Sequence, residues 1–448
     1  MKKEVYIVHC IDTEGPLYES LQGTFEKIFN TFGYKIEPTK ENLIKLQNKQ
    51  IDLNGNEEEV AKVVSENQVT TLGSWEEIGR MLDKITASEF RKALKDDAGN
   101  GWVYSWFCMD HVGFTGNNPR KRDVGYHNIY DYYQPRCQGE DSKDIIQWHY
   151  HPVSFNGEYN ACGINYVSGS NVFEILARKV IDRQFFPSAY RPGFNTERPD
   201  SHWLLEQWVP FDYANQSMTK VEYITQRDMI RGRFGNWEGA PTQWYPYHPA
   251  HEDYRKVGSC KRWITRCLNM NARMRTITKE DIYEAFSQAN EGEPALISFC
   301  NHDFRDMEQE IIKVREMIHE VSEVFEEVAF YFVDALTGMR KVLGLQPQKP
   351  QLTMEFVEQE VLHIQTQNDI FGSQPYFCFK TLTGQYLWSN LDYGENNEWW
   401  YTFDFHSIEL SCLEKIGIAT NSPDGTTEII IYDVRTKNQQ HYVNNFNE

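Results

Sequence analysis

Two acidic residues, Asp12 and Glu14, stand near the start of the sequence, where an apolar run ends. The run before them, EVYIVHCI (4–11), is rich in β-branched and aromatic residues, and Gly15-Pro16 after them is typical of a turn. The pattern predicts a strand whose tip carries both carboxylates. A carboxylate in such a place can bind a cation or accept a proton.

Titratable residues also stand at the ends of the next apolar runs. Asp110 and His111 follow 102–109, His149 and His151 lie at the end of 144–150, Arg191 follows 185–190, Asp212 follows 208–211, and His302 and Asp303 follow 295–300. The carboxyl ends of the strands of a parallel α/β barrel face one mouth, so we expect these side chains to converge there.

The pair of histidines in WHYHP (148–152) predicts a mononuclear metal centre. Residues two apart on a strand point the same way, so His149 and His151 can bind one ion together with a carboxylate from Asp12 or Glu14. Such a ligand set suits a divalent metal ion, Zn first and Fe, Mn, Co or Ni as alternatives. A bound cation lowers the pKa of water from ~15.7 to about 7. Taken alone, the same spacing is equally typical of two residues on an exposed strand face.

This interpretation gives each polar residue a role. Asp12, which is nearer the strand, is expected on the metal and Glu14 is expected to take the proton of the nucleophilic water. His302 would donate a proton to the leaving group, and the planar fork of Arg191 would hold the base or the substrate. The remaining residues of the mouth are candidate substrate-binding residues: Asp110, His111, Asp212 and Asp303.

The elements that must position these residues alternate along the chain. Seven apolar runs, the six above and 328–333, are separated by helical patterns such as 170–183, 278–289 and 305–327. Strand and helix in alternation predict a parallel sheet closed, or nearly closed, into a barrel over residues 1–343. Long insertions are expected at about 30–100 and 213–280.

The sequence pattern changes after residue 343. Residues 344–351 (GLQPQKPQ) form a polar, proline-bearing linker, and 352–448 contain short strands and turns without a convincing helix. This pattern predicts an all-β sandwich domain of about a hundred residues that helps to bind substrate or a second subunit. A homo-oligomer is therefore left open.

Composition narrows the class of protein. The 448 residues carry a formal net charge of -20, which argues against nucleic acid or an anionic membrane as partner. The nine cysteines are scattered without a CxxC pair, as in a reducing compartment, so the cytoplasm is the expected location. No apolar stretch approaches ~18 residues, so membrane insertion is not expected.

Five segments, in order, resemble the motifs of the polysaccharide deacetylase (NodB-homology) family of carbohydrate esterases: CIDTEGP (10–16), WHYHP (148–152), AYRPGFN (189–195), WVPFDYANQ (208–216) and SFCNHDF (298–304). The resemblance covers roughly residues 1–342. It implies a distorted barrel of seven parallel strands and metal-dependent removal of an acetyl group from a sugar or glycan precursor.

The sequence departs from the family pattern at two places. The family has two adjacent aspartates in its first motif, whereas Thr13 separates Asp12 from Glu14 here. Alignment on Gly15-Pro16 makes Glu14 the ligand, and alignment on the strand end favours Asp12. The family also spaces its histidine ligands by four residues rather than two, so the chain is similar to an atypical branch.

Two alternatives to a metal-dependent hydrolase remain at this point. One is a glycosidase on a similar barrel, with Asp110 and either Asp212 or Asp303 flanking a glycosidic bond. The other is a glycan-binding protein without catalytic activity. The basic run NNPRKRD (117–123) either recognises an acidic sugar or a nucleotide diphosphate, or is a solvated loop.

Overall fold

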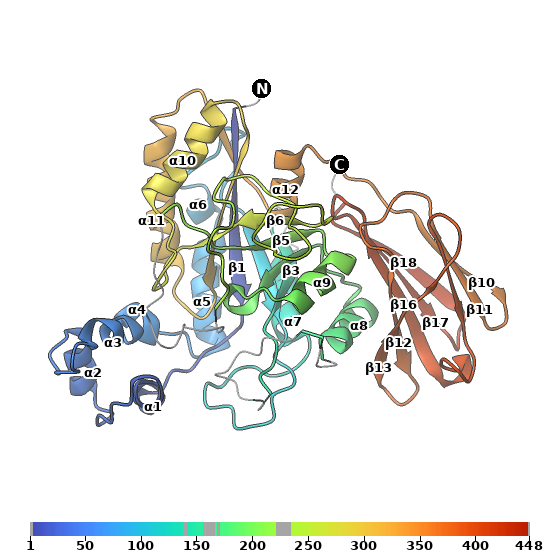
Figure 1. Cartoon of the computed structure of the whole chain (residues 1–448), viewed down its shortest axis with the longest axis horizontal. Helices are drawn as coiled ribbons and strands as arrows, with labels where there is room; N and C mark the ends of the chain where they lie inside the picture. Colours follow the sequence, from blue (N-terminus) through green and yellow to red (C-terminus); the bar gives the residue numbers. More distant parts are fainter. Residues whose placement is uncertain are drawn as a thin grey trace.

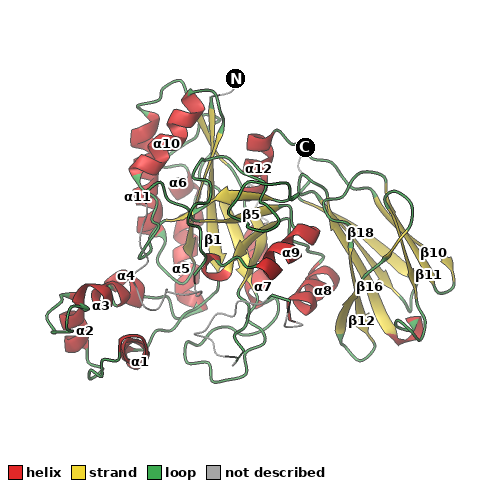
Figure 2. Ribbon diagram, viewed as in Figure 1, coloured by secondary structure: helices red, strands yellow, loops and turns green. Residues whose placement is uncertain are grey.

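The computed structural model of this protein describes residues 3–137, 142–155, 157, 166–167, 171–220 and 234–446. Its first part is a parallel sheet surrounded by helices, and its last part consists almost entirely of strands (Figures 1 and 2). The strands of the first part are β1 (Glu4–Thr13), β2 (Tyr104–Met109), β3 (Ile145–Tyr150), β4 (Ala189–Pro192), β5 (Phe211–Asn215), β6 (Trp263–Arg266), β7 (Leu268–Asn269), β8 (Ala295–His302) and β9 (Ala329–Phe332).

The parallel sheet is nearly closed into a barrel. The strand order is β6-β5-β4-β3-β2-β1-β8-β7, and β9 pairs with the first half of β1. Only Cys267 separates β6 from β7, so one stretch of chain pairs with β5 at its start and with β8 at its end. The predicted parallel barrel is therefore confirmed in outline. The strand count of seven is too low, because β6 and β7 lie within 213–280, which the sequence suggested was an insertion.

Burial on both faces explains why the strand sequences read as continuous apolar runs. In β1, Val5 and Ile7 belong to the core between the sheet and the outer helices, and Tyr6 and Val8 belong to the core inside the barrel. Every residue of β1 after Glu4 is buried. The polar residues at the tip of β1 are therefore held on a rigid element.

The helices cover the outside of the barrel and extend it on one side. They are α1 (Leu21–Phe32), α2 (Lys40–Gln47), α3 (Glu57–Val63), α4 (Glu66–Val69), α5 (Trp75–Thr86), α6 (Ser88–Arg91), α7 (Asn128–Cys137), α8 (Asn171–Arg183), α9 (Pro199–Trp208), α10 (Lys279–Asn290), α11 (Glu308–Ser322) and α12 (Ala335–Leu343). Helix α10 begins at a capping box of Thr278 and Asp281, as its sequence predicts.

Helices α1 to α4 form a small unit of their own beside the barrel, at the lower left of Figure 1. Phe25 and Ile28 of α1 pack with Leu46 of α2 and Val60 of α3 in a separate hydrophobic cluster. This unit follows the tip of β1 directly, so it lies next to the candidate site.

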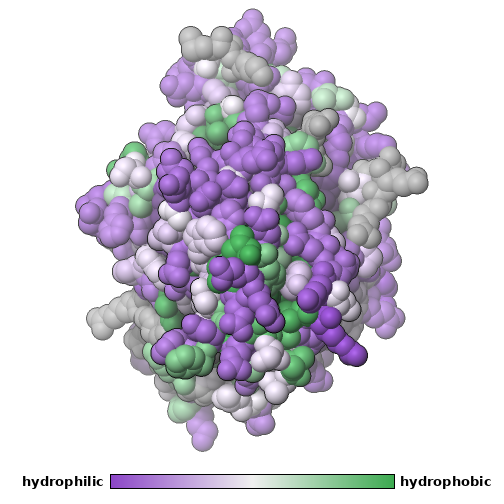
Figure 3. Space-filling model, turned by 90° about the vertical axis from the view of Figure 1, so that its right-hand side faces the viewer, coloured by the Kyte–Doolittle hydropathy of each residue, from purple (hydrophilic) through white to green (hydrophobic). Residues whose placement is uncertain are grey.

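The C-terminal domain is a sandwich of two antiparallel sheets. Its strands are β10 (Leu352–Glu358), β11 (Val361–Thr366), β12 (Tyr376–Thr381), β13 (Tyr386–Ser389), β14 (Asp392–Tyr393), β15 (Glu398–Thr402), β16 (Leu413–Asn421), β17 (Thr427–Asp433) and β18 (Asn438–Asn444). The sheet orders are β10-β11-β15-β14 and β13-β12-β16-β17-β18. Buried and exposed residues alternate at the start of β10, as expected for a sheet with one face in solvent. Figure 3 shows this side of the molecule, where hydrophobic residues form separate groups among hydrophilic ones.

The sandwich packs against α8 and the loop before β4. Phe173 of α8 stacks on Trp388 with ring centroids 4.1 Å apart, and the Tyr376 hydroxyl donates a hydrogen bond to the Phe173 carbonyl at 2.6 Å. The Asn421 side chain donates to the carbonyls of Pro187 and Trp208, both at 2.8 Å. The domain is thus fixed to the outer side of the barrel.

Two sequence expectations concern the chain as a whole. No helix within the described ranges combines the length and the apolar character that a membrane crossing requires. The eight cysteines that the structure describes are free thiols, and Cys162 lies outside the described residues.

Candidate metal centre

A cavity of ≈ 250 Å³ opens at the carboxyl ends of the barrel strands. The tips of β1, β3 and β8 line it together with residues of α1 and α4. None of its described lining residues comes from the C-terminal domain, so the sandwich contributes no side chain to this part of the site.

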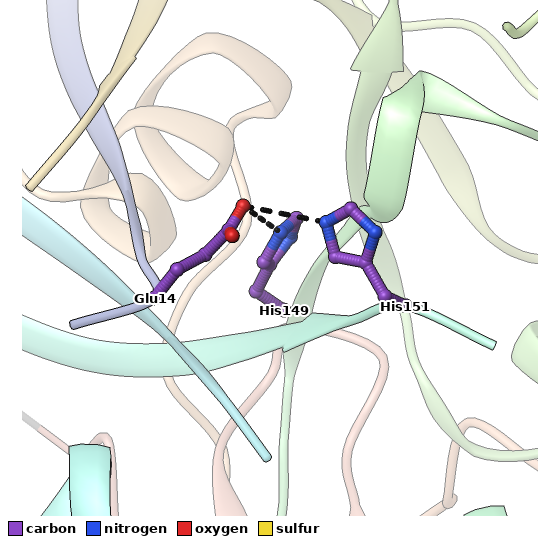
Figure 4. Close-up of side chains that lie close together, drawn as sticks. All are labelled: Glu14, His149 and His151. Atoms are coloured by element: carbon purple, nitrogen blue, oxygen red, sulfur yellow. Dashed lines mark ion pairs between the residues drawn. The ribbon is translucent and has the colours of Figure 1, made fainter. Parts of the chain in front are cut away.

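Glu14, His149 and His151 converge in this cavity (Figure 4). Glu14 Oε1 lies 3.6 Å from His149 Nε2 and 3.4 Å from His151 Nε2. One ligand atom from each of the three residues falls within 4.8 Å of the other two, which is the spacing a shared metal ion needs. The described residues of the chain contain no other such group.

The hydrogen bond of His149 decides which of its nitrogens can bind a cation. Its Nδ1 lies 2.9 Å from the backbone carbonyl of Arg191, and because a carbonyl can only accept, Nδ1 carries the hydrogen. In the neutral imidazole the lone pair is therefore on Nε2, which is buried, has no hydrogen-bond partner and faces the Glu14 carboxylate. A lone pair that faces a carboxylate requires a cation or a proton between them, so these residues fit a metal ion. The backbone carbonyl that orients the ring is the usual outer partner of a histidine ligand.

Arg122 holds the other oxygen of Glu14. Its Nη2 donates to Glu14 Oε2 at 2.6 Å, which leaves Oε1 directed at the two imidazoles. Burial opposes ionisation of Glu14, but the charge of Arg122 is the largest effect in the other direction, and the pKa of Glu14 lies well below its ordinary value. Glu14 is thus a carboxylate with one oxygen available to a cation. The sequence placed Arg122 in a solvated or substrate-binding loop, and no local signal pointed to this pairing.

Asp12 lies close by but is engaged differently. Arg191 donates to both of its oxygens, from Nε at 2.6 Å and from Nη2 at 3.0 Å. Burial raises the pKa of Asp12, and the charge of Arg191 more than reverses this, so that the pKa is about 2. The side of His149 that Asp12 approaches, at 3.7 Å, is Nδ1, which is already bonded. The structure therefore brings Glu14, rather than the predicted Asp12, together with the two histidines as the group that could hold a metal ion.

Arg191 is a positioning residue rather than a group at the cavity. It is fully buried and, besides Asp12, bonds to the Tyr213 carbonyl and to Cys267 Sγ. Its planar fork fixes the orientation of the Asp12 carboxylate.

His302 faces the two acids from the tip of β8. Its Nε2 lies 3.9 Å from Asp12 Oδ2 and 3.9 Å from Glu14 Oε1, and its side chain keeps 34% of its surface exposed. Burial lowers the pKa of His302 to about 4, although Asp12 and Glu14 pull it upward. The imidazole is therefore neutral near pH 7.

Asp303 and His111 support the turn that carries Glu14. The backbone N–H groups of Glu14 and Gly15 donate to the Asp303 carboxylate at 2.9 Å each, and the Tyr133 hydroxyl does so at 2.9 Å. His111 Nε2 donates to the Glu14 carbonyl at 2.9 Å. His111 borders the cavity, whereas Asp303 is fully buried and does not. The prediction that Asp303 binds substrate is corrected, because its oxygens hold the backbone.

Asp110 and Asp212 are likewise withdrawn from the cavity. Asp110 forms a buried ion pair with Lys179 of α8 at 2.9 Å. Asp212 forms one with Arg262 at 2.5 Å, and burial raises its pKa. Neither lines the cavity, so neither is placed to bind substrate, and the carboxylates considered for a glycosidase do not flank it.

Two residues after β4 shape the place of His151. A Cβ at Gly193 would lie 2.4 Å from Cγ and Nδ1 of the His151 ring, so the glycine makes room for this side chain. Phe194 has the left-handed φ of 53°, lines the cavity with 42% of its surface exposed, and meets the His151 ring edge-on at 5.0 Å. Such a strained backbone is common beside functional sites.

Comparison with known proteins does not assign this site to a family. No model of a protein family matches the sequence, and no curated protein matches it.

Proposed function

We propose that this protein is a metal-dependent hydrolase that removes an acyl group, acetyl first among the candidates, from a sugar or glycan precursor. The observation that carries the proposal is the buried lone pair of His149 Nε2, directed with His151 Nε2 at one oxygen of Glu14. The five ordered motifs of the sequence agree with the same chemistry.

Glu14, His149 and His151 would hold the cation, with Zn the first expectation and Fe, Mn, Co or Ni as alternatives. The ion supplies a Lewis acid that lowers the pKa of water and polarises the acyl oxygen. Arg122 keeps Glu14 in place through its second oxygen.

Asp12 is proposed to accept the proton of the nucleophilic water. It is ionised and held by Arg191, and it lies beside the three ligands without being one of them. His302 Nε2 lies 3.9 Å from Asp12 Oδ2, within reach through one bridging water, so that it can receive this proton and pass it to the leaving group. Because neutral His302 carries no spare proton near pH 7, it acts as a relay.

Aromatic side chains of the cavity suit a sugar ring. Phe114, Phe194 and Phe304 line it among the polar groups, and a few polar groups within a partly apolar cavity are typical of a small-molecule site.

The test combines elemental analysis with an assay of acetate release from acetylated sugars. We expect about one equivalent of a divalent metal in the wild type and none in a His149→Ala/His151→Ala variant whose circular dichroism is unchanged. Acetate release should depend on the metal and fail in the variant. A wild type that binds no metal after incubation with each ion would refute the hydrolase and favour a glycan-binding protein.

A further inference from the structure

The described lining of the cavity at the metal centre carries more cationic than acidic side chains, although the chain as a whole has a net charge of -20. Five cationic side chains and three acidic ones are found among its described lining residues. The cations are Lys27, Arg120, Arg122, Arg273 and Arg305, and the acids are Asp12, Glu14 and Glu19. A local excess of positive charge in an acidic protein attracts anions to the cavity and disfavours cations there.

Each acid of the lining is already engaged by a guanidinium. Arg191 holds Asp12 from behind, Arg122 pairs with Glu14 at 2.6 Å, and Arg120 pairs with Glu19 at 3.1 Å. An incoming anion therefore meets carboxylates whose charge is already balanced.

Arg273 and Arg305 line the same cavity as His302, and Arg305 is three residues from His302 in the sequence. Arg305 bonds to the Asn67 carbonyl and, at 3.3 Å, to Gln68 Oε1, which are neutral acceptors that leave its charge in place. Burial lowers the pKa of Arg305, Glu310 opposes this, and the like charge of Arg273 adds to the lowering. Glu310 is itself satisfied by Asn301 and Asn271, at 2.9 and 3.0 Å. The charges of Arg273 and Arg305 therefore repel each other, and an anion bound beside both would offset this repulsion.

Phe304 fixes the position of this charge. Its ring lies against the guanidinium of Arg305 at 5.5 Å and that of Arg122 at 5.1 Å, and its centroid is 4.9 Å from that of His302. The guanidinium of Arg305 therefore lies near His302, the residue proposed to pass a proton to the leaving group.

We propose that the substrate of this site is a sugar bearing an anionic group, phosphate or carboxylate, which Arg273 and Arg305 bind beside His302. This inference rests on the proposed function for the identity of the reaction, but the binding of the anion can be measured without it. Guanidinium groups present paired N–H donors that match both kinds of oxyanion. Lys27 of α1 adds a third cation from the helical unit beside the barrel.

The experiment measures binding by calorimetry at low salt with four probes. These are inorganic pyrophosphate, N-acetylglucosamine 1-phosphate, N-acetylmuramic acid and neutral N-acetylglucosamine. We expect the phosphorylated or the carboxylated sugar to bind at least tenfold more tightly than the neutral one. Preference for one of the two charged sugars identifies the anion, and this preference should weaken as NaCl is raised.

Variants assign the binding to the arginines. Arg273→Gln/Arg305→Gln should weaken binding of the preferred anion by on the order of a hundredfold, roughly tenfold for each guanidinium, because hydrogen bonds between charged groups are worth this much. Arg80→Gln, at a helix position 64% exposed and outside the cavity, is the matched control and should change nothing. Arg305→Lys keeps the charge if the glutamine variant fails to fold, and should lose less than Arg305→Gln. His149→Ala/His151→Ala should retain most binding, which separates the arginines from a metal-bound anion.

Equal affinity for the neutral and charged sugars, or full affinity in the double arginine variant, would overturn the anionic substrate. If either result were found in a protein that releases acetate from neutral sugars, the proposed hydrolase would stand and the anionic substrate would be rejected. Arginine-dependent anion binding in a protein that holds no metal and releases no acetate would support the anion site and reject the hydrolase.

Discussion

Exchanging the two acids of the first motif for their amides tests the assignment of Glu14 to the metal and Asp12 to the proton. Glu14→Gln leaves one oxygen to accept from Arg122 and replaces the other, which lies 3.4 and 3.6 Å from the two imidazoles, by an NH2 group that cannot bind a cation. Asp12→Asn removes a charge whose two oxygens are both bonded to Arg191. Each change keeps the shape of the side chain, so its effect reports on the charge.

The structure sets the size of each effect. Loss of an outer partner of a metal ligand typically costs about 10–100-fold in affinity, so loss of the ligand Glu14 should exceed this and reduce the metal content to near zero. The pKa of Asp12 is lowered from 3.8 to about 2, so its ionised form contributes about 2 kcal/mol of stability at pH 7. Asp12→Asn should lose at least this much stability, keep about one equivalent of metal, and lower kcat by roughly 10²–10⁴-fold.

Metal content by elemental analysis, thermal unfolding and acetate release would be measured on both variants and on Glu41→Gln, an exposed glutamate of α2 that serves as control. An Asp12→Asn protein without metal beside a Glu14→Gln protein that retains it would refute the reasoning and restore Asp12 as the ligand.

Three further predictions concern the surroundings of the site and the fold. Gly193→Ala should weaken metal binding at least tenfold in a chelator competition, because its Cβ would lie 2.4 Å from the His151 ring, whereas Gly116→Ala, with open space around it, should not; equal affinities would contradict the packing argument. Burial lowers the pKa of His9 from 6.5 to about 3, so stability is lost as pH falls from about 6.5 toward 3, by about 2 kcal/mol at pH 5 for this residue. Denaturant unfolding at pH 7 and 5 should show a smaller loss in His9→Gln, and an unchanged loss would reject His9 as the cause. Asn421→Ala removes three buried hydrogen bonds between the sandwich and the barrel and should cost about 2–5 kcal/mol in unfolding free energy, with a separate transition for the sandwich; a single transition at the wild-type midpoint would show that the domains are held elsewhere.

The parallel barrel could be predicted from the sequence, because strands buried on both faces must be apolar throughout, and the polar residues at their ends are then easy to recognise. It missed β6 and β7, which are short and lie in a long segment with little local pattern. Their closing role depends on pairing with β5 and β8, which are distant along the chain.

Within the site, residue types and spacing determined that Asp12, Glu14, His149, His151 and His302 gather at one mouth. Tertiary structure alone decided what each can do. Arg191 pairs with Asp12 and Arg122 pairs with Glu14. Asp110, Asp212 and Asp303 bond to buried partners instead of lining the cavity. These pairings join groups from different elements, so the local sequence does not predict them. The physical reason is that the sequence determines which groups are titratable, whereas burial and neighbouring charges decide their ionisation and which of them remain available to a ligand.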